Sequence, residues 1–249
     1  MSGDAPVVLV AEEGSVPHRA VARLAELGPE LPPFALIGGL AVITRLGQAH
    51  RATNDVDTVS DDQAGLVRVL VSAGFNRQGD SVLLETNLKL DVIDVSEGDP
   101  DYVPYLTHRF AFDTRDEVEL VVRPSSGGPT VAATVSVARA SALVAVKLSI
   151  GEGVGRQRDP RKVGSDAFDI VRLLQRHGPD ALADELVVLA DPSFVEHVLR
   201  LALRHLVNEV DRTAGAIVRS AVQGVQAVQA EQLELLGRAF VERLSAPHA

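Results

Sequence analysis

The apolar and polar positions of the chain follow two different periodicities, and the change comes near residue 138. Before it, short apolar runs typical of strands occur at 6–10, 34–37, 81–84, 88–95, 117–123 and 130–137. Between them lie helical patterns at 17–28, 40–46 and 62–73, and a polar stretch at 96–116 that predicts a long loop with a short element. After residue 138, helical spacing dominates. The pattern predicts an α+β fold, with a small mixed sheet in a domain over 1–137 and a mainly helical domain over 138–249.

Residues 34–60, FALIGGLAVITRLGQAHRATNDVDTVS, combine a strand, a Gly-Gly pair, a helix and a second strand that carries Asp55 and Asp57. Side chains two apart on a strand point the same way, so these two carboxylates lie side by side. Adjacent like charges favour a cation between them, and Mg²⁺ is the usual cation for oxygen-only ligands that also bind phosphate. The backbone N–H groups of Gly38 and Gly39, at a helix start, suit a phosphate.

This order of elements resembles the nucleotidyltransferase signature of the DNA polymerase β superfamily. The local sequence, IGGLAV followed by HRATNDVD, resembles the AbiEii/MenT toxin-type nucleotidyltransferases. The resemblance implies a polymerase-β-like core and an enzyme that moves NMP from an NTP to an acceptor hydroxyl with Mg²⁺ or Mn²⁺. Its motif positions are occupied by Gly38, Gly39, Arg51, Thr53, Asp55 and Asp57. It further implies an RNA acceptor, such as a tRNA 3′ end, and a cognate antitoxin protein as partner.

A third carboxylate is expected on the apolar strand LKLDVIDV, because enzymes of that superfamily carry one between two apolar residues. Asp91 and Asp94 both fit this form. They are three apart and therefore face opposite sides of a strand, so only one of them can join Asp55 and Asp57. Asp91 is the favoured metal ligand, and the alternative for Asp91 is a strand-end aspartate in a turn.

A second block, from the helix over 139–150 to Asp169, adds basic residues. Lys147 lies among apolar residues, so its side chain either extends to solvent or points into a site. The cluster Arg156, Arg158, Arg161 and Lys162 suits a triphosphate or a nucleic-acid backbone, although it also fits a solvated loop. By resemblance to the second half of AbiEii/MenT-type proteins, Lys147, Asp166 and Asp169 are catalytic, and the last two share one helix face.

The amino-acid composition limits which acceptors and partners are expected. The formal net charge of −10 means that the overall field does not steer the chain to nucleic acid, which favours a cationic small molecule as the alternative acceptor, as in aminoglycoside- and lincosamide-type nucleotidyltransferases. A second alternative is a non-catalytic module of the same fold that binds a nucleotide or a partner chain. The chain has no cysteine, and neither a signal peptide nor an apolar run long enough to span a bilayer is expected. Together these features favour a cytoplasmic protein with no membrane partner.

Overall fold

The computed structural model describes residues 5–49, 53–79, 82–85, 88–98, 102–149, 160–220 and 230–246. The chain forms two compact units. The sheet unit comprises Met1–Asp99 and Ala111–Arg139, and the helical unit comprises Pro100–Phe110 and Ala140–Ala249. The sequence predicted a boundary between residues 137 and 138. The boundary lies between 139 and 140, and residues 100–110 belong with the later helices.

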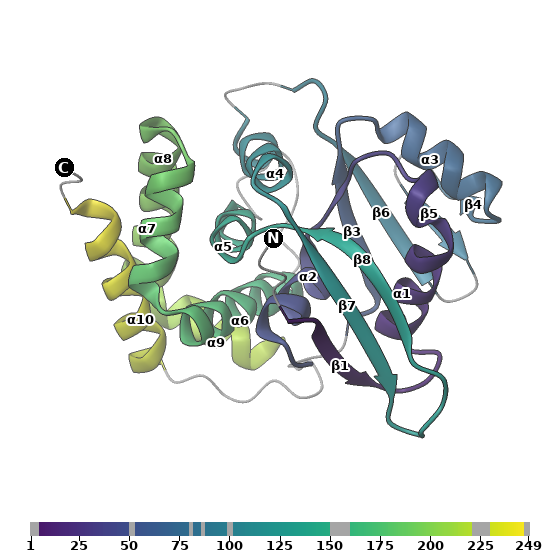
Figure 1. Ribbon diagram of the computed structural model, residues 1–249. Helices are drawn as coiled ribbons and strands as arrows, with labels where there is room; N and C mark the ends of the chain where they lie inside the picture. The colour runs from purple at the N-terminus through teal and green to yellow at the C-terminus, as the bar shows by residue number, and fades with distance from the viewer. Residues whose placement is uncertain are drawn as a thin grey trace. The chain divides into compact units, whose positions relative to one another are not determined.

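The described strands of the sheet unit form one mixed sheet in the order β1-β7-β8-β2-β3-β6-β5-β4 (Figure 1). The pairs β1–β7, β2–β8 and β3–β6 are parallel, and the pairs β2–β3, β4–β5, β5–β6 and β7–β8 are antiparallel. The strands are β1 (Val7–Ala11), β2 (Ala35–Leu36), β3 (Asp55–Ser60), β4 (Asn76–Arg77), β5 (Val82–Glu85), β6 (Leu88–Asp94), β7 (Asp116–Pro124) and β8 (Val131–Val137). The α+β class and the mixed sheet are thereby confirmed.

Three α-helices of the sheet unit, α1 (Val16–Leu27), α2 (Gly38–Leu46) and α3 (Gln63–Ser72), connect its strands. Helix α2 is apolar on nearly all sides, and eight of its nine residues are buried. It ends at Gly47, whose left-handed φ of +69° lets its N–H donate to Ile43 O and Thr44 O. Along β6 the residues alternate, so that Leu88, Leu90 and Val92 are buried while Lys89 and Asp91 on the opposite face are only partly covered.

The helical unit is built around α5 (Ala140–Ser149), all ten residues of which are buried. A helix that is apolar all round belongs in a core, and α5 packs against α6 (Pro160–His177), α7 (Pro179–Leu189) and α8 (Pro192–Ala202) (Figure 1). The remaining elements are a π-helical turn, η2 (Leu203–Asn208), and the helices α9 (Val210–Arg219) and α10 (Ala230–Ser245). The C-terminal helical bundle expected from the sequence is present.

The sequence predicted a long loop with a short element over 96–116, and that element is the helix α4 (Val103–Asp113). Local apolar periodicity is weak there, but a tertiary contact supplies what the local sequence lacks. Phe110 packs on Phe194 of α8, with ring centroids 4.6 Å apart. The helix is therefore stabilised by burial in the helical unit rather than by its own propensity.

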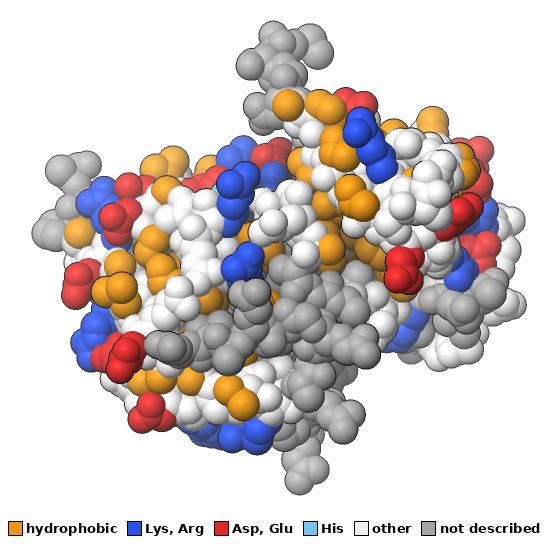
Figure 2. All heavy atoms as spheres, turned by 90° about the horizontal axis from the view of Figure 1, so that it is seen from below, with side chains coloured by type: hydrophobic (Ala, Val, Ile, Leu, Met, Phe, Trp, Pro, Cys, Tyr) orange, Lys and Arg blue, Asp and Glu red, His pale blue; other side chains and the backbone are white. Residues whose placement is uncertain are grey.

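Figure 2 shows a face on which acidic and basic side chains are interspersed with apolar ones. Because the two signs of charge are mixed on this face, its basic residues do not produce one broad positive electrostatic field. None of the helices in the described ranges combines the length and the apolar character that crossing a membrane requires.

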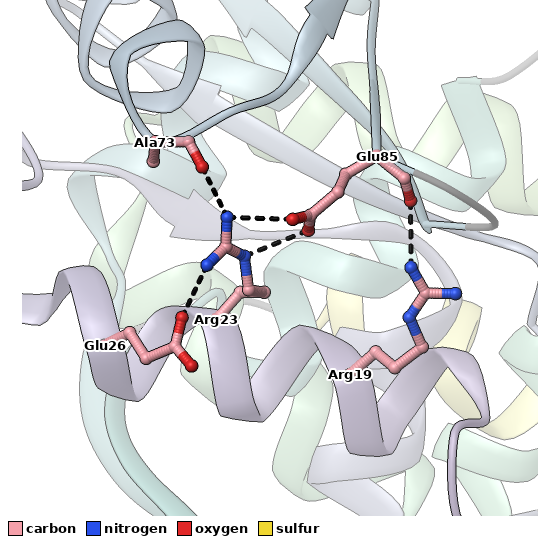
Figure 3. A network of polar contacts seen from close by, with 5 residues as sticks. All are labelled: Arg19, Arg23, Glu26, Ala73 and Glu85. Atoms are coloured by element: carbon pink, nitrogen blue, oxygen red, sulfur yellow. Dashed lines mark hydrogen bonds and ion pairs between the residues drawn. The ribbon is translucent and has the colours of Figure 1, made fainter.

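A polar network fixes strand β5, the neighbour of β6 (Figure 3). The guanidinium of Arg23 on α1 contacts the carboxylate of Glu85 on β5 at 2.9 Å, that of Glu26 at 2.5 Å, and Ala73 O after α3 at 2.5 Å. Arg19, one turn earlier, donates to Glu85 O at 2.9 Å. Charge-assisted bonds of this kind, partly shielded from water, tie α1 and the end of α3 to the sheet beside the strand that carries Asp91.

Candidate active site

Asp55, Asp57 and Asp91 converge on one face of the sheet. Strands β3 and β6 are parallel neighbours in a register that places Asp57 opposite Asp91 and Asp55 opposite Lys89. Each of the three aspartates is partly buried, and one carboxylate oxygen from each lies within 4.8 Å of the others. The alternation of side chains brings the first two together, and the pairing register brings the third to them.

Asp94, the alternative third carboxylate, has a different role. It is exposed, and its Oδ1 accepts hydrogen bonds from the backbone N–H of Ser96 at 2.8 Å and from Ser96 Oγ at 2.7 Å. This is an aspartate that caps the turn after a strand. Of the two candidates, the geometry therefore gathers Asp91 with Asp55 and Asp57.

Gly38 determines how closely Asp57 approaches the start of α2. Its φ of +58° is in the left-handed region, and a Cβ at this position would lie 1.9 Å from Asp57 Oδ2. The backbone N–H of Ile37 donates to Asp57 O at 2.9 Å, which holds the two segments together. Only glycine allows both this conformation and this contact, so the Asp57 carboxylate lies against the first turn of a helix, where the N–H groups favour negative charge.

Other residues of the predicted motif lie around this centre. Gly39 follows Gly38 in the first turn of α2 and is buried. Thr53 is buried, and its Oγ1 donates to Asp55 O at 3.1 Å, which steadies the chain as it enters β3. Arg51 lies outside the described residues.

Lys89 was not singled out in the sequence, yet it belongs to this cluster. Its Nζ lies 2.6 Å from Asp91 Oδ2, and its side chain is 43% exposed. The hydrogen bond to Asp91 raises the pKa of the Lys89 ammonium, and the charges of Asp91, Asp55 and Asp57 add to this effect against the opposing influence of burial. The signal was present in the sequence, because Lys89 stands two residues before Asp91 and hence on the same strand face.

The chemistry of these donors fits a hard divalent cation. All three candidate ligands are carboxylates, and carboxylate oxygens are what Mg²⁺ and Mn²⁺ prefer. The formal charges of three carboxylates and the Lys89 ammonium leave a sum of −2 at this face. A cation that also binds phosphate oxygens would offset that charge.

Lys147, Asp166 and Asp169 form a second ionic cluster, inside the helical unit. Lys147 Nζ on α5 lies 2.6 Å from Asp166 Oδ1 and 3.1 Å from Asp169 Oδ2 on α6, and these side chains are 4%, 5% and 0% exposed. Of the two possibilities for Lys147, extension to solvent is thus ruled out. Burial raises the pKa of the Asp166 carboxyl and outweighs the attraction of Lys147. Asp166 Oδ2 is buried and has no hydrogen-bond partner among the residues that the structure describes.

A small cavity adjoins this cluster. It has a volume of about 30 Å³, and Lys147, Asp166, His205 and Thr213 are among the residues that line it. The space suits one or two water molecules, which would satisfy Asp166 Oδ2. The cluster therefore joins α5 to α6 through polar contacts in an otherwise apolar interior.

The predicted basic cluster is described only in part. Arg156 and Arg158 lie outside the described residues. Arg161 falls in the first turn of α6, and Lys162 beside it is exposed. These positions place two of the four residues at a helix start.

The chain has a distant likeness to solved structures. No protein-family model matches the chain, and no curated protein matches it. Among solved structures, the chain is similar to an antigenic nucleotidyltransferase-like protein from Paracoccidioides brasiliensis, with 18% identity and a TM-score of 0.42, over 75% of this chain and 93% of that one. A likeness of this degree is too low to establish a shared fold or function.

Proposed function

We propose that the protein is a metal-dependent nucleotidyltransferase that moves NMP from an NTP to an acceptor hydroxyl. One observation carries the proposal: the carboxylates of Asp55, Asp57 and Asp91 converge within 4.8 Å on one sheet face. The approach of Asp57 to Gly38 adds a helix start to the same place. Clustered carboxylates beside N–H groups suit a cation and a phosphate together.

Each residue has a distinct task in this proposal. Asp55, Asp57 and Asp91 would hold Mg²⁺ or Mn²⁺, which when bound would neutralise charge on the triphosphate and on the leaving pyrophosphate. Asp91 serves in addition as the candidate base for the acceptor hydroxyl. The backbone N–H groups at Gly38 and Gly39 contact phosphate oxygens.

Further residues are assigned to the triphosphate and the acceptor. These are Arg51, Thr53, Arg156, Arg158, Arg161 and Lys162, on the strength of their charge or of the motif positions that they occupy. Lys147, Asp166 and Asp169 keep the catalytic role that the AbiEii/MenT resemblance implies for them. Their mutual ion pairs also support a structural role, and the two roles predict different effects of Lys147→Met on stability and on transfer.

The acceptor proposed is RNA, with a tRNA 3′ end as the first candidate and a toxin paired with an antitoxin as the biological setting. The choice of an RNA acceptor rests on the resemblance of the sequences IGGLAV and HRATNDVD to the AbiEii/MenT motif. A cationic small molecule such as an aminoglycoside is the second candidate, and the net charge of −10 favours it. A non-catalytic nucleotide-binding module is the third.

The test is a transfer assay with Mg²⁺, each α-labelled NTP in turn, and total tRNA or an aminoglycoside as acceptor. Alanine at Asp55 or Asp57 should reduce transfer by roughly three orders of magnitude, since charge stabilisation is usually the largest catalytic contribution. Asp94→Ala is the matched control and should transfer normally, because Asp94 only caps a turn.

The pattern of label decides among the candidates. Label on tRNA supports the RNA acceptor, and label only on the drug supports the small-molecule one. Near-normal transfer by both aspartate variants would refute the proposed site. Absence of transfer together with calorimetry that detects no Mg²⁺-dependent NTP binding would refute the enzyme assignment and leave the binding module.

A further inference from the structure

Lys89 carries a positive charge into the place where a divalent cation is expected to bind. It stands opposite Asp55 in the β3–β6 register, and its ammonium contacts Asp91 Oδ2 at 2.6 Å. Its side chain is 43% exposed, so the far end has room to move. A lysine has a flexible four-carbon stem and a compact charge, and it can exchange one partner for another without disturbing the strand.

The Lys89 ammonium and a divalent cation cannot both bind the carboxylates of this face at full strength. Both seek the carboxylate oxygens, and the two positive charges repel each other at short range. A cation that arrives alone must therefore displace Lys89 from Asp91. A cation that arrives on a triphosphate brings negative oxygens, with which the displaced ammonium can pair.

We propose that Lys89 couples cation binding to nucleotide binding: its ammonium leaves Asp91 when the cation binds and pairs with a phosphate of the incoming triphosphate. The exchange makes the site bind the cation–triphosphate complex in preference to the bare cation. This inference rests on the proposed function of the same carboxylates and adds the residue that discriminates between the two ligands.

The experiment compares Mn²⁺ alone with the complex of Mn²⁺ and inorganic tripolyphosphate, each titrated into the full chain by calorimetry. Lys89→Met keeps an unbranched side chain of similar length and removes its charge. We expect this variant to bind Mn²⁺ alone about tenfold more tightly and the tripolyphosphate complex about tenfold more weakly than the wild type. Lys89→Arg keeps the charge and should restore the wild-type order of affinities.

Arg123→Met is the matched control for the loss of one positive charge. Arg123 is exposed on β7, which β8 and β2 separate from β3 in the sheet. Three strand spacings amount to roughly 14 Å, which is beyond the Debye length in physiological salt. This control should change neither affinity.

The expected changes in the two affinities of Lys89→Met have opposite signs, which separates a coupling role of Lys89 from a structural one. A Lys89→Met variant that binds both ligands more tightly, both more weakly or both as before would overturn the role of Lys89 while leaving the carboxylate site intact. A wild-type protein that binds neither Mn²⁺ nor its tripolyphosphate complex would overturn the proposed function itself, and this inference with it.

Discussion

Gly38→Ala tests whether the closeness of Asp57 to α2 matters for the site. An added Cβ would lie 1.9 Å from Asp57 Oδ2, and real Cβ contacts essentially never fall below 3.0 Å. The Asp57 carboxylate, or the helix start, must therefore move by about 1 Å. The left-handed φ of +58° adds backbone strain of about 1–2 kcal/mol for any L-residue with a side chain.

Gly47→Ala separates these two effects. Gly47 ends the same helix, has a φ of +69°, and a Cβ there would meet nothing within 4 Å. Both variants should lose about 1–2 kcal/mol of unfolding free energy from backbone strain. Only Gly38→Ala should also weaken Mn²⁺ binding, by roughly 10- to 100-fold, as expected when the support of a metal ligand is disturbed.

Urea denaturation gives the unfolding free energy, and Mn²⁺ titration followed by calorimetry gives the Mn²⁺ affinity. The comparison is made at a urea concentration of zero, where both variants remain folded. If Gly38→Ala binds Mn²⁺ as tightly as Gly47→Ala does, then either Asp57 is not a ligand or its contact with Gly38 does not position it. Either result refutes the reasoning that glycine is required at this place.

Three further predictions concern single side chains. Asp91→Asn should abolish Mn²⁺ binding measured by calorimetry, whereas Asp94→Asn on the same strand should not, because Asp94 is exposed and caps a turn. Lys147→Met should lower the unfolding free energy in urea by about 3 kcal/mol, since it leaves two carboxylates buried without their cation; unchanged stability with lost transfer would instead favour a catalytic role. Asp166 faces Lys147 and Asp169 and has a pKa above its ordinary value of 3.8, so the unfolded chain binds fewer protons than the folded chain as pH rises from about 4, and the unfolding free energy falls. Asp166→Asn should remove this fall, so the unfolding free energies from urea denaturation at pH 4.5 and pH 7 should differ less than in the wild type; an equal difference would show that Asp166 does not cause the fall, and a larger one that Asp166 is needed as an anion.

The sequence determined the local elements because their signals are local. Alternation over 88–95 predicts a strand with one buried face, and β6 has that pattern. The helical pattern at 40–46 after the Gly-Gly pair predicts a helix, and α2 covers Gly38–Leu46. The helical pattern over 139–150 likewise predicts a helix, and α5 covers Ala140–Ser149.

The tertiary structure decided which of these elements meet. Asp91 and Asp94 have equivalent sequence surroundings, and only the β3–β6 register selects Asp91 as the neighbour of Asp57. In the same way, α4 required the contact between Phe110 and Phe194, which lie far apart in the sequence. Periodicity within one segment carries no information on its partner, so it could not supply either result.

The tertiary structure also determined the surroundings of the charged residues. The sequence left two possibilities for Lys147, and two carboxylates on α6 fix it in the interior of the helical unit. Lys89 shares a strand face with Asp91 in the sequence, and only the pairing of β3 with β6 brings Asp55 and Asp57 close to it as well. A charge in a chain has no definite surroundings until folding sets its distance to other charges and to water, because electrostatic energy depends on both.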